Sequence, residues 1–211
     1  METKLTEQES LSIISEMIEQ ARNNFRKGSG NSMIFYGIVV SALAILNVIA
    51  ALVLTKLNIH PNYSFWMWCL MIPVIYIGTL IQKKVERESM VKTHLDSIIS
   101  STWKGYIYSV YLFFVIIFCI GLGKKMYDVF YLINPVLLVF VGLAEFVSAK
   151  TYRFKPYFYG AITMWAGALA CVALMWTPMP VILQFFVLAF CMFFGFVIPG
   201  LKLNKLAKEN V

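Results

Sequence analysis

The sequence has little charge and few residues that could carry out chemistry. Only 14% of its 211 residues are charged and 60% are hydrophobic, whereas about a quarter of residues are charged in an average soluble domain. Its two histidines, His60 and His94, lie far apart, and no CxxC pair or Cys/His cluster occurs. These gaps leave no support for a metal site or a disulfide framework. Each cysteine lies in an apolar run, as expected of a small packing residue: Cys69, Cys119, Cys171 and Cys191.

The motifs of common enzyme classes are also missing. The chain has no Walker phosphate loop, no GxSxG turn and no Rossmann glycine pattern. It offers no nucleophile paired with a general base. The sequence therefore predicts a protein that is not an enzyme and needs no cofactor. Its basic residues flank apolar segments instead of forming a stripe with stacking aromatics, so no nucleic-acid partner is expected.

Long apolar runs are what the sequence has in quantity. Six segments are nearly free of charge, and a run of about 17 to 25 such residues crosses a hydrocarbon core as a helix. The aromatic share of 16% fits this interpretation, because Trp and Tyr collect at membrane–water interfaces. The expected spans are residues 33–54, 65–81, 105–122, 129–149, 157–176 and 181–201.

Two further segments predict amphipathic helices outside the bilayer. Thr6 and Glu9 form a capping box, and apolar residues recur every three or four positions until Gly28 supplies a stop. This pattern places a helix over residues 5–27, and a second one is expected in the charged connection 82–104. The chain then divides into a helix-and-hinge segment (1–30), a six-span domain (31–203) and a basic tail (204–211).

The predicted fold class is therefore all-α. It is an integral membrane bundle of six transmembrane helices in three hairpins, with two amphipathic cytoplasmic helices. Orientation follows from the basic residues, because Lys and Arg accumulate on the cytoplasmic side. Fifteen of the 18 lie on one side, and the other side holds only Lys56, Lys124 and Lys125. Both termini are expected to be cytoplasmic.

Glu145 is the only ionisable residue well inside an expected span. An intramembrane carboxylate is by default a candidate for a proton relay, an ion ligand or a counter-charge. Only five residues separate it from the next cation, about 7.5 Å along the helix axis. The preferred interpretation is therefore structural: the side chain reaches the cytoplasmic interface or pairs with a nearby cation, Lys150, Arg153 or Lys155.

Two amides are the other candidates for a binding site within the membrane. Asn47 lies in the middle of the first expected span, and Asn134 precedes Pro135 near the outer end of the fourth. Proline inside a helix tends to bend it, and broken helices with buried amides line transport sites. More often such an amide holds helices together, and this interpretation is preferred for both.

The fifth expected span has a face of small residues: Gly160, Thr163, Gly167 and Cys171. Small faces let helix backbones approach closely, so the fifth span is expected to be central, with the Phe-rich sixth packed over it and facing lipid. Self-association through this face is the alternative. Membrane lipids are also expected partners, because basic segments such as 152–157 suit anionic headgroups. Ordinary topology anchoring explains the same residues and is preferred.

Packing and turn motifs are spread along most of the chain: Glu9-Ser10-Leu11, Gly28-Ser29-Gly30, Asn134-Pro135, Gly142, Phe154-Lys155-Pro156, Gly160, Trp165 and Ile198-Pro199-Gly200. In these motifs the chain resembles an uncharacterised family of small six-span bacterial inner-membrane proteins. The resemblance implies a location in the bacterial inner membrane and no known activity.

The sequence favours a non-enzymatic function. The predicted protein is a membrane-embedded scaffold or regulatory subunit, in which the helix over residues 5–27 docks a protein partner or a second copy. The alternative is a small transporter or channel that uses Glu145 and the kinked fourth helix.

Overall fold

The computed structural model describes residues 11–13, 15, 30–59, 61–87 and 94–209. These residues are helical with short turns and form no strand. Six helices are long and apolar enough to cross a membrane, which confirms the all-α class and the six apolar helices. They are Asn31–Lys56, Tyr63–Ile81, Ser97–Gly123, Tyr127–Tyr152, Lys155–Trp176 and Pro180–Ala207. The predicted helix over 5–27 lies outside the described residues except for 11–13 and 15.

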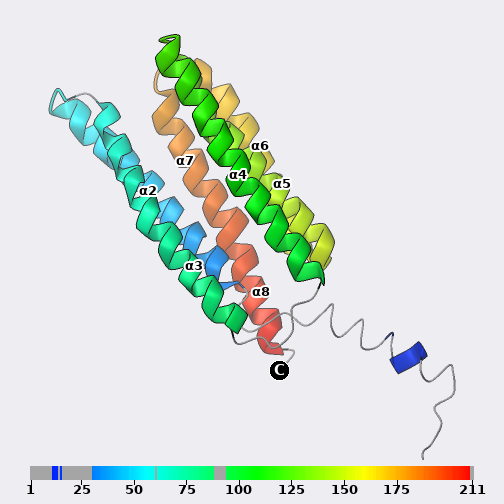
Figure 1. The fold of residues 1–211 in the computed structure, drawn as a ribbon. Coiled ribbons are helices and arrows are strands. Elements are labelled where there is room, and N and C mark those ends of the chain that lie inside the picture. The colour runs from blue at the N-terminus through cyan, green and yellow to red at the C-terminus, as the bar shows by residue number, and fades with distance from the viewer. Residues whose placement is uncertain (1–10, 14, 16–29, 60, 88–93, 210–211) are drawn as a thin grey trace, which may run out of the picture.

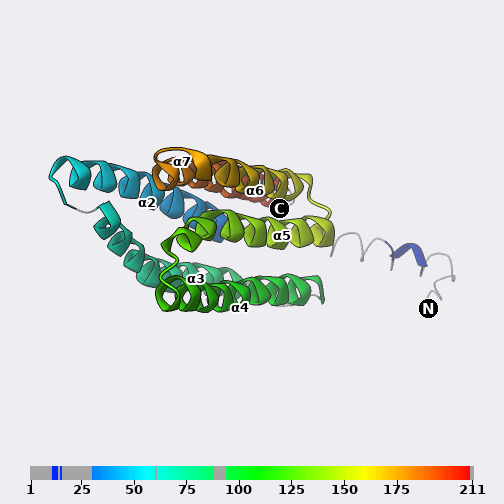
Figure 2. The same ribbon diagram turned by 90° about the horizontal axis from the view of Figure 1, so that it is seen from above.

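The spans are built from α-helices joined to short 3₁₀ and π segments (Figures 1 and 2). In chain order the elements are α2 (Asn31–Lys56), the 3₁₀ helix η1 (Pro61–Leu70), α3 (Met71–Arg87), α4 (His94–Gly123), the 3₁₀ helix η2 (Tyr127–Leu132), α5 (Ile133–Tyr152), α6 (Lys155–Ala173), the 3₁₀ helix η3 (Leu174–Trp176), α7 (Pro180–Met192), the π-helix η4 (Phe193–Val197) and α8 (Ile198–Glu209).

The separate surface helix predicted over residues 82–104 is not what the structure has. α3 continues to Arg87 and α4 already begins at His94, so the described parts of this connection extend the second and third spans. The connection contains no Pro or Gly that would end a helix. The same correction applies to the tail predicted over 204–211, because α8 runs on to Glu209.

The sixth span is the most enclosed part of the bundle. α7 packs against α2 on one side and against α6 on the other, as Figure 1 shows. Half of the sixth span's most apolar stretch is buried (50%), against 33% for the fifth. The prediction of a central fifth span with the sixth facing lipid is therefore wrong. The Phe side chains divide between two faces: Phe185 and Phe196 are buried, whereas Phe186, Phe190, Phe193 and Phe194 are exposed.

α3 and α4 are the outer helices. α3 packs on α2 and η1, whereas α4 packs on α5 and η2. Only 11% of the apolar stretch of each span is buried. Figure 2 places both on the same side of the bundle, and Figure 1 shows that they stand apart. Their many exposed apolar side chains suit contact with lipid tails, which are as apolar as Leu.

The first and last spans are tied together at the end of the bundle that carries the C-terminus. The Gly30 backbone N–H donates a hydrogen bond to Asn204 Oδ1 at 2.9 Å, and Asn204 Nδ2 donates to Asn31 Oδ1 at 2.7 Å. Farther along, the Ser41 hydroxyl donates to the Ala189 carbonyl at 2.9 Å. α2 is thereby fixed against both α7 and α8.

The turn between α5 and α6 is only two residues long. Arg153 closes α5 in the left-handed conformation, with φ of 51°. The Phe154 N–H then donates to the Ala149 carbonyl at 3.1 Å, and the Phe154 ring lies edge-on to Tyr157 with 5.0 Å between centroids. This turn brings α5 and α6 together along their length, and the candidate site lies on the face they share.

Candidate functional site

Glycines at the α5–α6 contact let the two helices approach closely. A Cβ added at Gly142 of α5 would lie 2.6 Å from Cδ1 and Nε1 of Trp165. A Cβ added at Gly160 of α6 would lie 2.9 Å from Oε2 and 3.1 Å from Oε1 of Glu145. Both are closer than real Cβ contacts allow, so the close packing depends on the absence of a side chain. The Glu145 carboxyl group fills the space that Gly160 leaves.

Glu145 is fully buried and has no hydrogen-bond partner. Its side chain is 0% exposed, and neither carboxyl oxygen accepts or donates a hydrogen bond. Tyr157 of α6 and Cys191 of α7 lie within electrostatic range of the carboxyl group. An ionisable group in this position is costly to bury, so it is the strongest candidate for a functional residue.

The prediction that Glu145 reaches the interface or pairs with a cation is wrong. Lys150 Nζ instead lies over the rings of Phe146 and Phe158, at 5.4 Å and 5.6 Å from their centroids. A separation of five residues is short along the helix axis, but it turns the side chain by about 140° around the helix. Glu145 therefore faces α6 and the sixth span, while Lys150 lies on another side of α5.

The sixth span forms a π-helix next to this site. The π segment Phe193–Val197 interrupts the α-helix of α7 and α8. The Gly195 carbonyl oxygen would lie 2.7 Å from a Cβ at Gly160, so these two glycines bring the π segment against α6 directly beside Glu145. π segments are rare and occur frequently at functional sites.

Asn47 has a structural role in the described residues. Its Nδ2 donates to the Ser64 carbonyl at 2.9 Å, and the Ser64 hydroxyl lies 3.5 Å from Asn47 Oδ1. Both residues are buried. The pair fastens η1 onto α2, as expected of an amide that holds helices together.

Asn134 is buried at the second residue of α5. The neighbouring Pro135 lies in the first helical turn, where backbone N–H groups have no partner within the helix. Pro135 therefore removes no hydrogen bond, and the predicted kink in the fourth helix is wrong. The irregularity of this span is the change from η2 to α5 at Leu132 and Ile133. Eleven residues, or about 16 Å of helix, separate Asn134 from Glu145, so the two do not form one site.

The sequence analysis missed three features that matter here. The first is Gln184, which is 1% exposed and donates from Nε2 to the Cys171 carbonyl at 3.0 Å. Its isolation in an apolar run was a visible signal. The second is the apposition of Gly160 and Gly195, and the third is the π segment, neither of which has a local signature in the sequence.

The small-residue face of the fifth span is used within the chain. Gly160, Gly167 and Cys171 are buried, and a Cβ at Gly167 would collide with Cys191 Sγ. Cys191 Sγ also lies 3.5 Å from the Thr163 carbonyl, to which it donates. These residues therefore pack against the sixth span of the same molecule.

Comparisons with protein-family profiles, with curated proteins and with solved structures found no match to this chain. The resemblance to an uncharacterised family of bacterial inner-membrane proteins stays a prediction. The case for a function therefore depends on the chemistry of the site, and the chemistry centres on one residue, Glu145.

Proposed function

We propose that the protein is a small transporter or channel whose cycle takes up and releases a proton at Glu145. The observation that carries the proposal is a fully buried carboxyl group without a hydrogen-bond partner. Other buried polar side chains do donate hydrogen bonds in the structure: Ser41, Asn47, Ser148 and Gln184. Because no packing or capping role uses the Glu145 carboxyl group, a functional role explains its presence best.

The space around Glu145 favours a proton over a larger ligand. Gly160 is packed against the carboxyl oxygens, and Met164 beside it is 0% exposed. A proton needs no added volume, whereas a metal ion needs several oxygen ligands. No cluster of three His, Cys, Asp or Glu side chains is found among the described residues. Reversible protonation also removes the cost of burying the charge.

The neighbouring π segment supplies a means of movement in this proposal. A π segment holds one more residue per turn than an α-helix, and a shift of that residue along the chain rotates the side chains between the two positions. Such a shift in Phe193–Val197 would change the contact between Gly195 and Gly160. Access to Glu145 would then alternate without a large displacement of whole helices.

The test is proton flux in vesicles that contain the purified protein and a pH-sensitive dye, driven by an imposed membrane potential. We expect Glu145→Gln to abolish flux, because the amide keeps the shape but cannot exchange a proton, and Glu145→Asp to retain part of it. Ser148→Ala is the matched control, since the buried Ser148 hydroxyl bonds only to its own helix, at the Ala144 carbonyl. Equal flux in wild type and Glu145→Gln, or no flux in wild type, would overturn the proposal.

We also propose that the protein lies in the bacterial inner membrane with both termini in the cytoplasm. Support comes from the basic residues, because the ends of α3, α5 and α8 and the starts of α4 and α6 carry most of them. Figure 1 shows these helix ends at one end of the bundle. Lys56 and the Lys124-Lys125 pair fall at the opposite end, the distribution expected from the positive-inside rule.

The scaffold function remains the alternative proposal. Its support is the amphipathic pattern of residues 5–27, most of which lie outside the described residues. A partner that binds this segment would leave Glu145 without a role, so the phenotype of Glu145→Gln at matched expression separates the two functions.

A further inference from the structure

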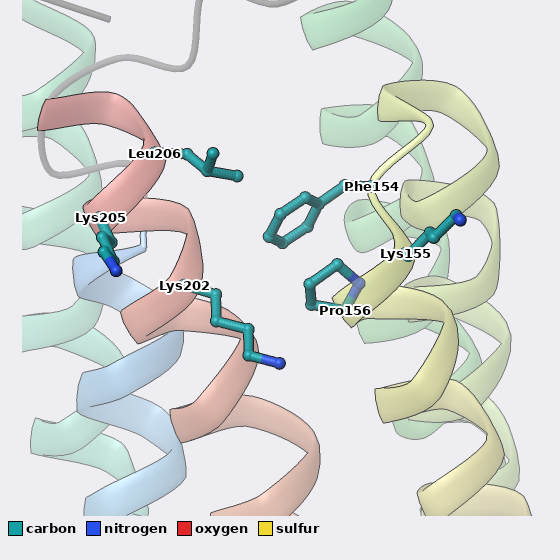
Figure 3. Close-up of a pocket in the computed structure, with 6 residues that line it drawn as sticks. All are labelled: Phe154, Lys155, Pro156, Lys202, Lys205 and Leu206. Carbon is teal, nitrogen blue, oxygen red and sulfur yellow. The ribbon is translucent and has the colours of Figure 1, made fainter. Parts of the chain in front are cut away.

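A groove of about 420 Å³ lies between the start of α6 and α8. It is lined by Phe154, Lys155, Pro156, Lys202, Lys205 and Leu206. Figure 3 shows Phe154 and Pro156 on one wall, facing Leu206 and Lys202 on the other, with the Lys155 ammonium group on the outer side of α6. The groove has no contact with Asn47 or Asn134 and does not depend on the function proposed for Glu145.

The charge of the groove is entirely positive. Three of its six lining residues are lysines and none is acidic. The N-terminal end of α6 also borders it, and this end carries the positive pole of the helix dipole. The N-cap residue of α6, Phe154, provides no side-chain hydrogen bond to that end. The groove therefore attracts an anion.

The position of the groove along the bundle restricts the source of that anion. Lys155 is the first residue of the fifth span, and Lys202 and Lys205 lie in the last turns of the sixth. The groove therefore lies where apolar helices meet the headgroup layer of a bilayer about 30 Å thick in its hydrocarbon region. A molecule that reaches it from the membrane would carry both an anionic and an apolar part.

We infer that this groove binds the headgroup of an anionic phospholipid. Lys202 and Lys205 hold the phosphate, and Lys155 adds charge from the opposite rim. Phe154, Pro156 and Leu206 contact the glycerol and the first acyl carbons. A freely soluble phosphate would use only the lysines and would leave this apolar wall exposed.

The test measures binding of short-chain phosphatidylglycerol, with phosphatidylcholine as a neutral comparison, to the full-length protein in detergent. Each cation near a membrane surface changes affinity for anionic lipid about fivefold. We expect Lys202→Gln/Lys205→Gln to weaken phosphatidylglycerol binding about thirtyfold and to leave phosphatidylcholine binding unchanged. The matched control is Lys124→Gln/Lys125→Gln, which removes the same net charge at the other end of the bundle and should keep wild-type affinity.

Three results would overturn the inference: no loss in the groove variant, an equal loss in the control, or displacement of the lipid by inorganic phosphate at the same concentration. The last result would indicate a site for a free anion. Should the double variant not fold, Lys155→Gln and Lys205→Gln as single variants carry the same test, with an expected loss of about fivefold each. Lys202→Arg/Lys205→Arg should retain binding, because it keeps both charges.

Discussion

Gly160→Ala tests the packing around Glu145 directly. The added methyl group would lie 2.7 Å from the Gly195 carbonyl oxygen and 2.9 Å and 3.1 Å from the two oxygens of Glu145. The carboxyl group can rotate away, but Gly195 O belongs to the backbone of the π segment and cannot move alone. Overpacking of this kind costs about 1–3 kcal/mol.

A second glycine separates this clash from the intrinsic preference of Ala for helices. Replacing Gly by Ala inside a helix stabilises it by about 1 kcal/mol, and this gain partly offsets the clash at Gly160. Gly105 of α4 lies within a helix and has no heavy atom within 4 Å of its added Cβ. Gly105→Ala therefore provides the gain alone, and the difference between the two variants isolates the clash at about 1–3 kcal/mol.

The assay is unfolding of both variants and wild type in the same detergent, followed by loss of helical circular dichroism. We expect Gly105→Ala to be equal to or more stable than wild type, and Gly160→Ala to fall below Gly105→Ala by the stated difference. If the two variants have the same stability, α6 and the π segment do not pack as described, and the enclosed environment of Glu145 is wrong as well.

Three further predictions concern the rest of the bundle. Asn204→Ala should destabilise the fold by about 1–2 kcal/mol, because the backbone N–H at the start of α2 loses its acceptor; Thr102→Val, whose hydroxyl bonds only its own helix, is the control with near-zero effect in the same unfolding assay. In a background without native cysteines, Met179→Cys should react with an impermeant thiol reagent from outside intact cells and Lys84→Cys should not; the reverse pattern would contradict the proposed orientation. Deletion of residues 1–27 should leave the bundle inserted and folded, as judged by its elution and helix content, and an aggregated product would show that this segment is part of the core.

The apolar spans could be predicted because length and hydropathy are local properties of a sequence. Residues 33–54 and 129–149 needed no information about their neighbours to be identified as helices. Helix ends were harder, since the ends of α3 and α4 extend beyond the apolar runs through a charged stretch that nothing interrupts. Hydropathy marks where a helix can meet lipid, and it does not mark where the backbone stops being helical.

The environment of Glu145 required a second coordinate. Its distance along the axis from Lys150 was clear from the sequence, and it suggested an ion pair. The direction in which the side chain points depends on which helix covers that face of α5, and this is decided by Gly160 and the π segment, far away in the chain. The position of Pro135 shows the same difficulty, because a proline has a different effect in the first turn than in the middle of a helix.

The π segment also sets the phase of everything that follows it. Deleting one residue from Phe193–Val197 would restore a continuous α-helix, and it would rotate the rest of the chain by about 100° and draw it back by about 1.5 Å. Asn204 would then turn away from the start of α2, and Lys202 and Lys205 would leave the wall of the groove. One extra residue beside Glu145 thus acts as a spacer that aligns the basic end of the sixth span with two different neighbours at once.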